Sequence, residues 1–142
     1  MIFIQIASYR DPQLTKTIDD CIAKAKHPDQ LSFGICWQFG DDEDLKGYFQ
    51  DKNINYIPVP IKDTLGACWA RSMVNKLYNN EEYTLMIDSH MRFEQDWDET
   101  LIEMLESLPY KSVLTTYAPA FNINTEEKTY NPWIMNVDRR YP

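Results

Sequence analysis

Short apolar runs rich in β-branched and aromatic residues alternate along this chain with stretches whose apolar residues recur at helical spacing. Runs of this kind predict buried strands. They lie at residues 1–7, 31–39, 55–60, 83–87 and 112–117. The prolines of the third run favour a position at a sheet edge, because proline cannot donate to a central hydrogen-bond ladder. This alternation is the strongest constraint on the fold.

The segments between the apolar runs predict helices. Asp11 is placed to cap a helix that begins at Pro12, where the missing N–H of proline does no harm. Thr64 or Asp63 can cap a further helix over residues 65–79. Each helix therefore joins the end of one predicted strand to the start of the next.

Strands that alternate with helices predict an α/β fold with a mainly parallel, Rossmann-like sheet and helices on both faces. Residues 1–117 are expected to form this core, and residues 118–142 show no sustained period, which indicates an irregular segment. We therefore expect a single domain over residues 1–142.

Composition excludes several classes of protein. A net charge of −8 disfavours non-specific binding of nucleic acid. The start of the chain lacks the pattern of a secretory signal, and no apolar run has the length of a membrane span. Cys21, Cys36 and Cys68 are scattered without metal-ligand spacing and fit thiols in a reducing compartment. We expect a cytoplasmic protein that contacts neither nucleic acid nor membrane.

Ligands of a parallel sheet bind outside the carboxyl ends of its strands, where Asp88 and His90 follow the fourth run. Side chains two residues apart on a strand point to the same side, so this carboxylate and imidazole could bind one cation. Such donors suit Mn²⁺ or Mg²⁺, with a substrate phosphate and waters as further ligands. The alternative is that Asp88 caps a turn and His90 is a surface histidine.

Other polar residues are expected at the same edge of the sheet. Arg71 could bind a diphosphate through its guanidinium, or be a solvated charge on a helix. After the first run, a nucleotide base could stack on Tyr9 or donate a hydrogen bond to Asp11, unless Asp11 serves only as a helix cap. Trp37 and Gln38 follow the second run and could line the same cleft.

Four motifs follow one another along the chain: FIQIASYRDP at residues 3–12, FGI with WQ within 33–38, GACWAR at 66–71, and IDSHMRF at 87–93 followed by WD at 97–98. In this order they resemble the GlcNAc-transferase family, which includes the enzyme that adds GlcNAc to a hydroxyproline of a cytoplasmic ubiquitin-ligase subunit. The Asp-Ser-His triplet also looks like that of the mucin-type polypeptide GalNAc-transferases.

This resemblance implies a GT-A fold, a UDP-sugar donor, a divalent metal and retention at the anomeric carbon. Asp88 and His90 correspond to the family's metal-binding pair, and Arg71 to its donor-contacting arginine. The nucleotide-contacting loop of the family corresponds to Ser8, Tyr9, Arg10 and Asp11. No residue of this chain matches a catalytic nucleophile.

One departure from the family concerns length. In related enzymes the acceptor-binding loops and a further metal-binding histidine lie well downstream of the triplet, whereas this sequence ends at residue 142. The sequence therefore looks like the donor-binding portion of such an enzyme, either truncated at the C-terminus or naturally reduced. The alternatives are a catalytically inactive nucleotide-sugar-binding or assembly module and a nucleotidyltransferase. The acceptor, a polypeptide or a glycan, is not specified, and an oligomer is possible.

Overall fold

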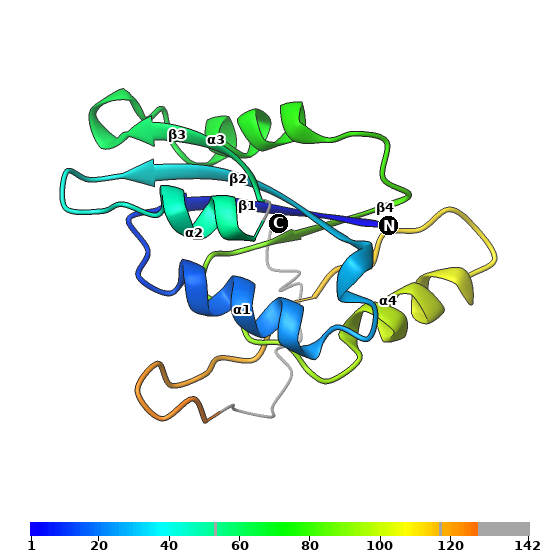
Figure 1. Ribbon diagram of the computed structural model, residues 1–142. Helices are drawn as coiled ribbons and strands as arrows, with labels where there is room; N and C mark the ends of the chain where they lie inside the picture. The colour runs from blue at the N-terminus through cyan, green and yellow to red at the C-terminus, as the bar shows by residue number, and fades with distance from the viewer. Residues whose placement is uncertain (53, 117, 128–142) are drawn as a thin grey trace, which may run out of the picture. The chain divides into compact units, whose positions relative to one another are not determined.

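The computed structural model describes residues 1–52, 54–116 and 118–127 (Figure 1). Its centre is a four-stranded sheet with the strand order β3-β2-β1-β4, in which every neighbouring pair is parallel. The strands are β1 (Ile2–Tyr9), β2 (Leu31–Phe39), β3 (Asn55–Pro60) and β4 (Tyr83–Ile87). The predicted α/β class with a parallel, Rossmann-like sheet is confirmed, and the proline-bearing strand β3 lies at an edge of the sheet.

Short helices connect the strands, and one more helix follows the last strand. They are α1 (Leu14–Lys24), α2 (Lys46–Asp51), α3 (Ala67–Val74) and α4 (Trp97–Glu106), with 3₁₀ turns η1 (Pro28–Gln30), η2 (Ile61–Asp63) and η3 (Asn75–Leu77). Among the described residues, no helix is both long and apolar enough to cross a membrane. The chain divides into two units, Met1–Thr100 and Leu101–Pro142, and the sheet belongs to the first.

Both faces of the sheet are covered. On one face, Ala70 and Val74 of α3 pack with Phe3 and Cys36 in a buried apolar cluster. Trp37, the next residue after Cys36, must point to the other face because strand side chains alternate. There its indole packs edge-on against Phe49 of α2, with ring centroids 5.6 Å apart. The predicted helices on both faces are therefore present.

The strand order explains why the helices divide between the two faces. From β1 to β2 to β3 the chain moves in one direction across the sheet, and from β3 it returns past β2 and β1 to β4. Right-handed crossovers in opposite directions put their helices on opposite faces. The direction reverses at β1, and the rule for open parallel sheets places a ligand crevice at such a switch point, here between the carboxyl ends of β1 and β4.

Two predicted helices begin later than expected. The helix predicted from Pro12 begins at Leu14, although Asp11 does accept a hydrogen bond from the Gln13 N–H, with Oδ1 at 2.8 Å. The helix predicted over residues 65–79 is α3 followed by the η3 turn. Its N-cap is Gly66 at φ 94°, a backbone angle that residues with a Cβ rarely adopt, so the helix cannot start earlier.

The fifth predicted strand is absent from the described part of its range. Residues 112–116 form no regular structure, and Val113 is 88% exposed. The prediction was wrong because β propensity reports how well a side chain fits a pleated, half-buried surface, and these side chains have no such surface. Tyr117 lies outside the described residues. Of the irregular segment predicted at 118–142, residues 118–127 are described and contain a turn closed by the Asn122 N–H and the Glu127 carbonyl at 2.9 Å.

Gly34 of β2 provides a test of packing between the sheet and α3. A Cβ built on Gly34 would lie 3.3 Å from Cγ1 of Val74 and closer still to the ring of Phe3. Gly34→Ala should therefore lower the free energy of unfolding by about 1–3 kcal/mol through overpacking, as measured by urea denaturation. The control is Gly47→Ala in α2, where a Cβ meets nothing within 4 Å. A similar loss in both variants would contradict this packing account.

Candidate functional site

Polar residues that follow β1 and β4 meet at the switch point of the sheet, between the carboxyl ends of these two strands. Ile6 of β1 pairs with Ile87 of β4, so residues 8–11 and residues 88–90 leave the sheet side by side. The structure thereby brings the segments after the first and fourth strands to the place that the α/β rule predicts. The side chains that these segments carry then determine what the crevice can bind.

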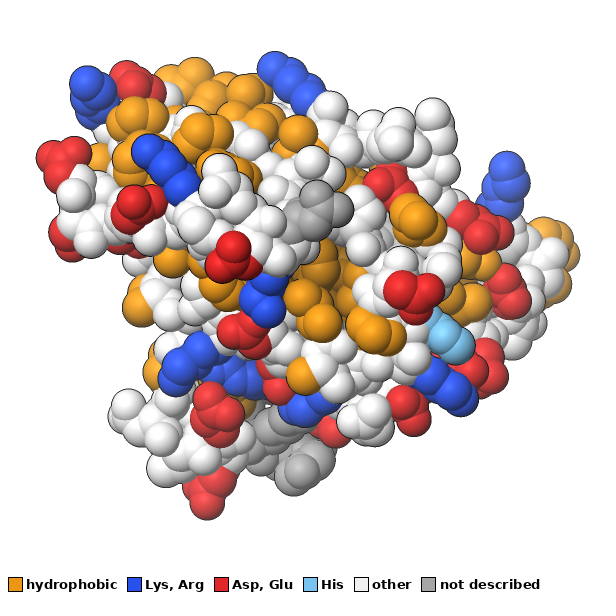
Figure 2. All heavy atoms as spheres, viewed as in Figure 1, with side chains coloured by type: hydrophobic (Ala, Val, Ile, Leu, Met, Phe, Trp, Pro, Cys, Tyr) orange, Lys and Arg blue, Asp and Glu red, His pale blue; other side chains and the backbone are white. Residues whose placement is uncertain are grey.

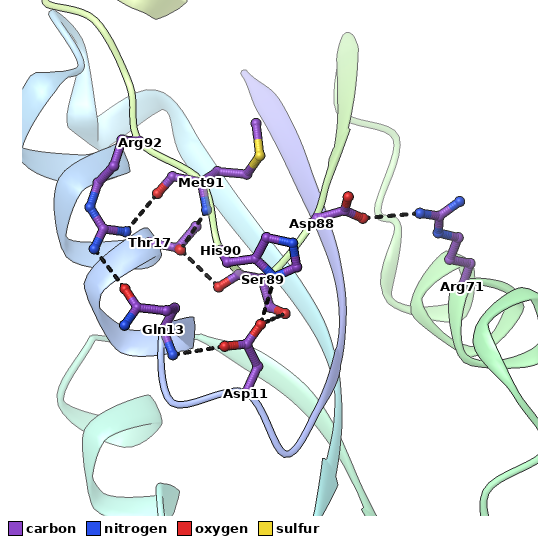
Figure 3. A network of polar contacts seen from close by, with 9 residues as sticks. All are labelled: Asp11, Gln13, Thr17, Arg71, Asp88, Ser89, His90, Met91 and Arg92. Carbon is purple, nitrogen blue, oxygen red and sulfur yellow. Dashed lines mark hydrogen bonds and ion pairs between the residues drawn. The ribbon is translucent and has the colours of Figure 1, made fainter. Parts of the chain in front are cut away.

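Asp11 links the segments that follow β1 and β4 within a network of polar contacts (Figure 3). Its Oδ2 accepts a hydrogen bond from Ser89 Oγ at 2.6 Å and lies 2.8 Å from His90 Nδ1. Burial raises the pKa of Asp11, but the hydrogen bonds from Ser89, His90 and the Gln13 N–H outweigh it, so the pKa lies below its ordinary value. Asp11 is therefore a carboxylate at neutral pH.

The Asp88 side chain points away from Asp11, toward α3. Its Oδ1 pairs with Arg71 Nη2 of α3 at 3.2 Å, and the two side chains are about half exposed. Figure 3 shows the Asp88 carboxylate directed toward Arg71 and the His90 ring directed toward Asp11. Because β4 ends at Ile87, the strand alternation that predicts a common side for Asp88 and His90 does not continue through these residues.

The chemistry of Asp88 and His90 fits a divalent cation that is shared with a ligand. A carboxylate oxygen and an imidazole nitrogen are donors that Mn²⁺ accepts, and both side chains are more than half exposed. Within the described ranges, no group of three His, Cys, Asp or Glu side chains is arranged to hold a metal. A cation here would need phosphate oxygens and waters to complete its coordination.

The other predicted site residues divide into buried and exposed ones. Ser8 and Gln38 are buried, and Gln38 donates from Nε2 to the Ser8 carbonyl at 3.1 Å, which ties β2 to β1 at their carboxyl ends. Tyr9 is 58% exposed and is available for stacking. The Arg10 guanidinium lies against the acidic loop after β2, where it pairs with Asp42 at 3.0 Å. Asp11, Arg71, Asp88 and His90 are thus brought to the crevice, whereas Arg10 is directed away to Asp42.

Thr17 and Ser89 are site residues that the sequence interpretation missed. Thr17 is fully buried in α1, donates from Oγ1 to the Ser89 carbonyl at 2.8 Å, and accepts from the Met91 N–H at 3.0 Å. The two bonds fasten the loop after β4 to α1. The sequence did contain a signal for Thr17, because its hydroxyl lies among Leu14, Ile18 and Cys21 on the apolar face of a helix. A buried hydroxyl requires a hydrogen-bond partner.

Comparison with known proteins shows the family of the chain. The family model described as Glycosyltransferase (GlcNAc) matches residues 1–47 and 40–137. The chain belongs to the GlcNAc glycosyltransferase family. Neither a curated protein nor a solved structure matches the chain. The resemblance based on the four motifs is thereby confirmed at the level of the GlcNAc glycosyltransferase family, whose match includes every residue of the crevice described above.

Proposed function

We propose that this chain binds a UDP-sugar, UDP-GlcNAc, between the carboxyl ends of β1 and β4 and serves the transfer of GlcNAc. The observation that carries the proposal is the placement of Asp88, His90 and Arg71 at the switch point of a parallel sheet in a GlcNAc glycosyltransferase. Nucleotide ligands of doubly wound sheets bind at this point.

In this proposal Asp88 and His90 hold a divalent cation, Mn²⁺ or Mg²⁺, which would neutralise charge on the diphosphate leaving group. Arg71 supports the same task. Its guanidinium already reaches the Asp88 carboxylate, so it would also contact anionic oxygens of a ligand bound beside that residue. Fixed positive charge around the departing UDP stabilises the transition state more than the ground state.

The transfer breaks the bond between the anomeric carbon of the sugar and the β-phosphate oxygen, and UDP leaves with the electron pair. An acceptor hydroxyl oxygen bonds to the anomeric carbon, and its proton passes to the departing phosphate or to water. Retention of configuration and kinship with the hydroxyproline and polypeptide GalNAc-transferases are parts of the proposal that rest on the motifs. The acceptor is a polypeptide or glycan hydroxyl, and the exposed thiol of Cys68 suits the proposed cytoplasmic location.

Calorimetry with UDP tests the donor site directly. Mn²⁺ should raise the affinity of the folded protein for UDP by at least about tenfold, because a cation shared by Asp88, His90 and the diphosphate removes charge repulsion between carboxylate and ligand. The matched titration is made without Mn²⁺, in a buffer that contains a chelator to remove divalent metal ions. Equal affinities with and without Mn²⁺ in a folded sample would overturn the proposal.

A second candidate is a nucleotide-sugar-binding or assembly module without turnover. The donor-side residues described above suffice for binding, and none of them is a nucleophile. Hydrolysis of UDP-GlcNAc that disappears in Asp88→Ala would exclude this candidate. UDP binding without hydrolysis or transfer would favour it.

A further inference from the structure

The contacts of Asp11 determine which nitrogen of His90 is protonated. Among the described residues, Asp11 Oδ2 has two neighbours, Ser89 Oγ at 2.6 Å and His90 Nδ1 at 2.8 Å. An ionised carboxylate can only accept hydrogen bonds, so both neighbours must donate. The proton of a neutral His90 ring is therefore on Nδ1, and the lone pair is on Nε2.

The rest of the structure holds this arrangement in place. Asp11 Oδ1 accepts from the Gln13 N–H at 2.8 Å, and the Leu14 N–H donates to the Asp11 carbonyl at 3.2 Å, so α1 anchors the residue. On the other side, Thr17 fastens the Ser89 carbonyl at 2.8 Å. Two segments that are far apart in the sequence thus position one carboxylate against one imidazole.

Asp11 is poorly placed to contact a nucleotide itself. Its side chain is only 16% exposed, whereas the His90 side chain is 58% exposed. Both carboxylate oxygens already accept hydrogen bonds within the protein. In the described part of the chain, Nε2 of His90 has no hydrogen-bond partner, which leaves this atom available to a ligand.

We propose that Asp11 is a positioning residue, which holds His90 through Nδ1 and presents Nε2 to the divalent cation, and is not a nucleotide contact. The inference rests on the proposed function, because it assigns the cation to His90. A histidine that binds a metal through one nitrogen commonly donates from the other to a carboxylate, which fixes the ring and increases its basicity. Asp11 is the residue that supplies this carboxylate.

The tautomer of His90 is the first measurement and needs no metal. The chain has two histidines, so ¹⁵N-imidazole labelling in a His27→Gln background isolates His90. Long-range ¹H–¹⁵N spectra at about pH 8.5, where free imidazole is neutral, should show His90 protonated at Nδ1. In Asp11→Ala this preference should be lost. Protonation mainly at Nε2 in the protein with Asp11 present would overturn the proposal.

The second measurement is the affinity for Mn²⁺ in the presence of UDP, by calorimetry. Asp11→Ala should weaken it by about 10-fold to 100-fold, the usual effect of removing such a partner. Asp11→Asn, whose amide oxygen can still accept from Nδ1, should show a smaller loss, and it replaces the alanine variant if that one fails to fold. An unchanged affinity in a folded Asp11→Ala would overturn the positioning role.

Asp20→Ala is the matched control. Asp20 is a carboxylate of α1 that is 19% exposed and anchors the same loop by accepting from the Phe93 N–H at 2.6 Å, without contact to His90. It should change Mn²⁺ affinity less than threefold; a loss as large as that of Asp11→Ala would assign the effect to loop anchoring and overturn the proposal. If Mn²⁺ fails to enhance UDP binding in the unaltered protein, the proposed function and this inference both fail. If only the effect of Asp11→Ala is missing, this inference alone fails.

Discussion

Asp88→Ala should remove the metal-dependent part of UDP binding, with a loss of about tenfold or more in the affinity for UDP at saturating Mn²⁺. Replacing a residue that merely orients a ligand already costs 10-fold to 100-fold in metal affinity, and Asp88 is proposed to bind the metal itself. Its carboxylate stands free of the sheet after β4 and is 59% exposed, so its removal leaves no buried cavity. Calorimetry with UDP, with and without Mn²⁺, measures the effect.

The ion pair between Arg71 and Asp88 separates the effect expected with Mn²⁺ from the effect expected without it. In Asp88→Ala the Arg71 guanidinium loses its ion pair, so metal-free binding of UDP should be retained while the enhancement by Mn²⁺ disappears. Glu82→Ala is the matched control, since Glu82 is an exposed carboxylate just before the opposite end of β4. If Asp88→Ala kept the full enhancement by Mn²⁺, Asp88 could not be a ligand of the metal.

Asp98→Ala should lower the free energy of unfolding by about 3 kcal/mol. Asp98 is 2% exposed, and its two oxygens accept from the backbone N–H groups of Lys26 at 2.7 Å and His27 at 2.9 Å. These residues follow the end of α1, and truncation would leave two part-buried donors without an acceptor. Urea denaturation measures the loss. Glu99→Ala is the control, because Glu99 forms an exposed pair with Lys26 and should change stability by less than about 1 kcal/mol.

The same carboxylate predicts a dependence on pH. Burial raises the pKa of Asp98, but the backbone hydrogen bonds from Lys26 and His27 lower it more, so the folded pKa lies below the ordinary value of 3.8. A group with a depressed folded pKa contributes stability above its unfolded pKa and loses that contribution as the pH falls through the folded pKa. Stability should therefore fall below about pH 4 more steeply with Asp98 than in Asp98→Asn. Parallel curves for the two proteins would contradict this account.

The sequence predicted the strands well where an apolar run was bounded by turn residues. β2, β3 and β4 have the predicted bounds, since β-branched and aromatic residues fill both faces of a covered parallel sheet. It failed at residues 112–116, where similar residue types meet no sheet. Local preference supplies a candidate strand, and a partner ladder decides whether it forms.

The candidate site shows the same division. The sequence by itself determined that Asp88 and His90 follow a strand and that Asp11 follows another, and the rule for parallel sheets then placed them at one edge. The tertiary structure decided the pairings, because hydrogen bonds such as that between Asp11 and His90, 79 positions apart, depend on β1 and β4 becoming neighbours. Sequence spacing carries no information about which carboxylate oxygen meets which nitrogen, and only the pairing of the strands brings the two within 2.8 Å.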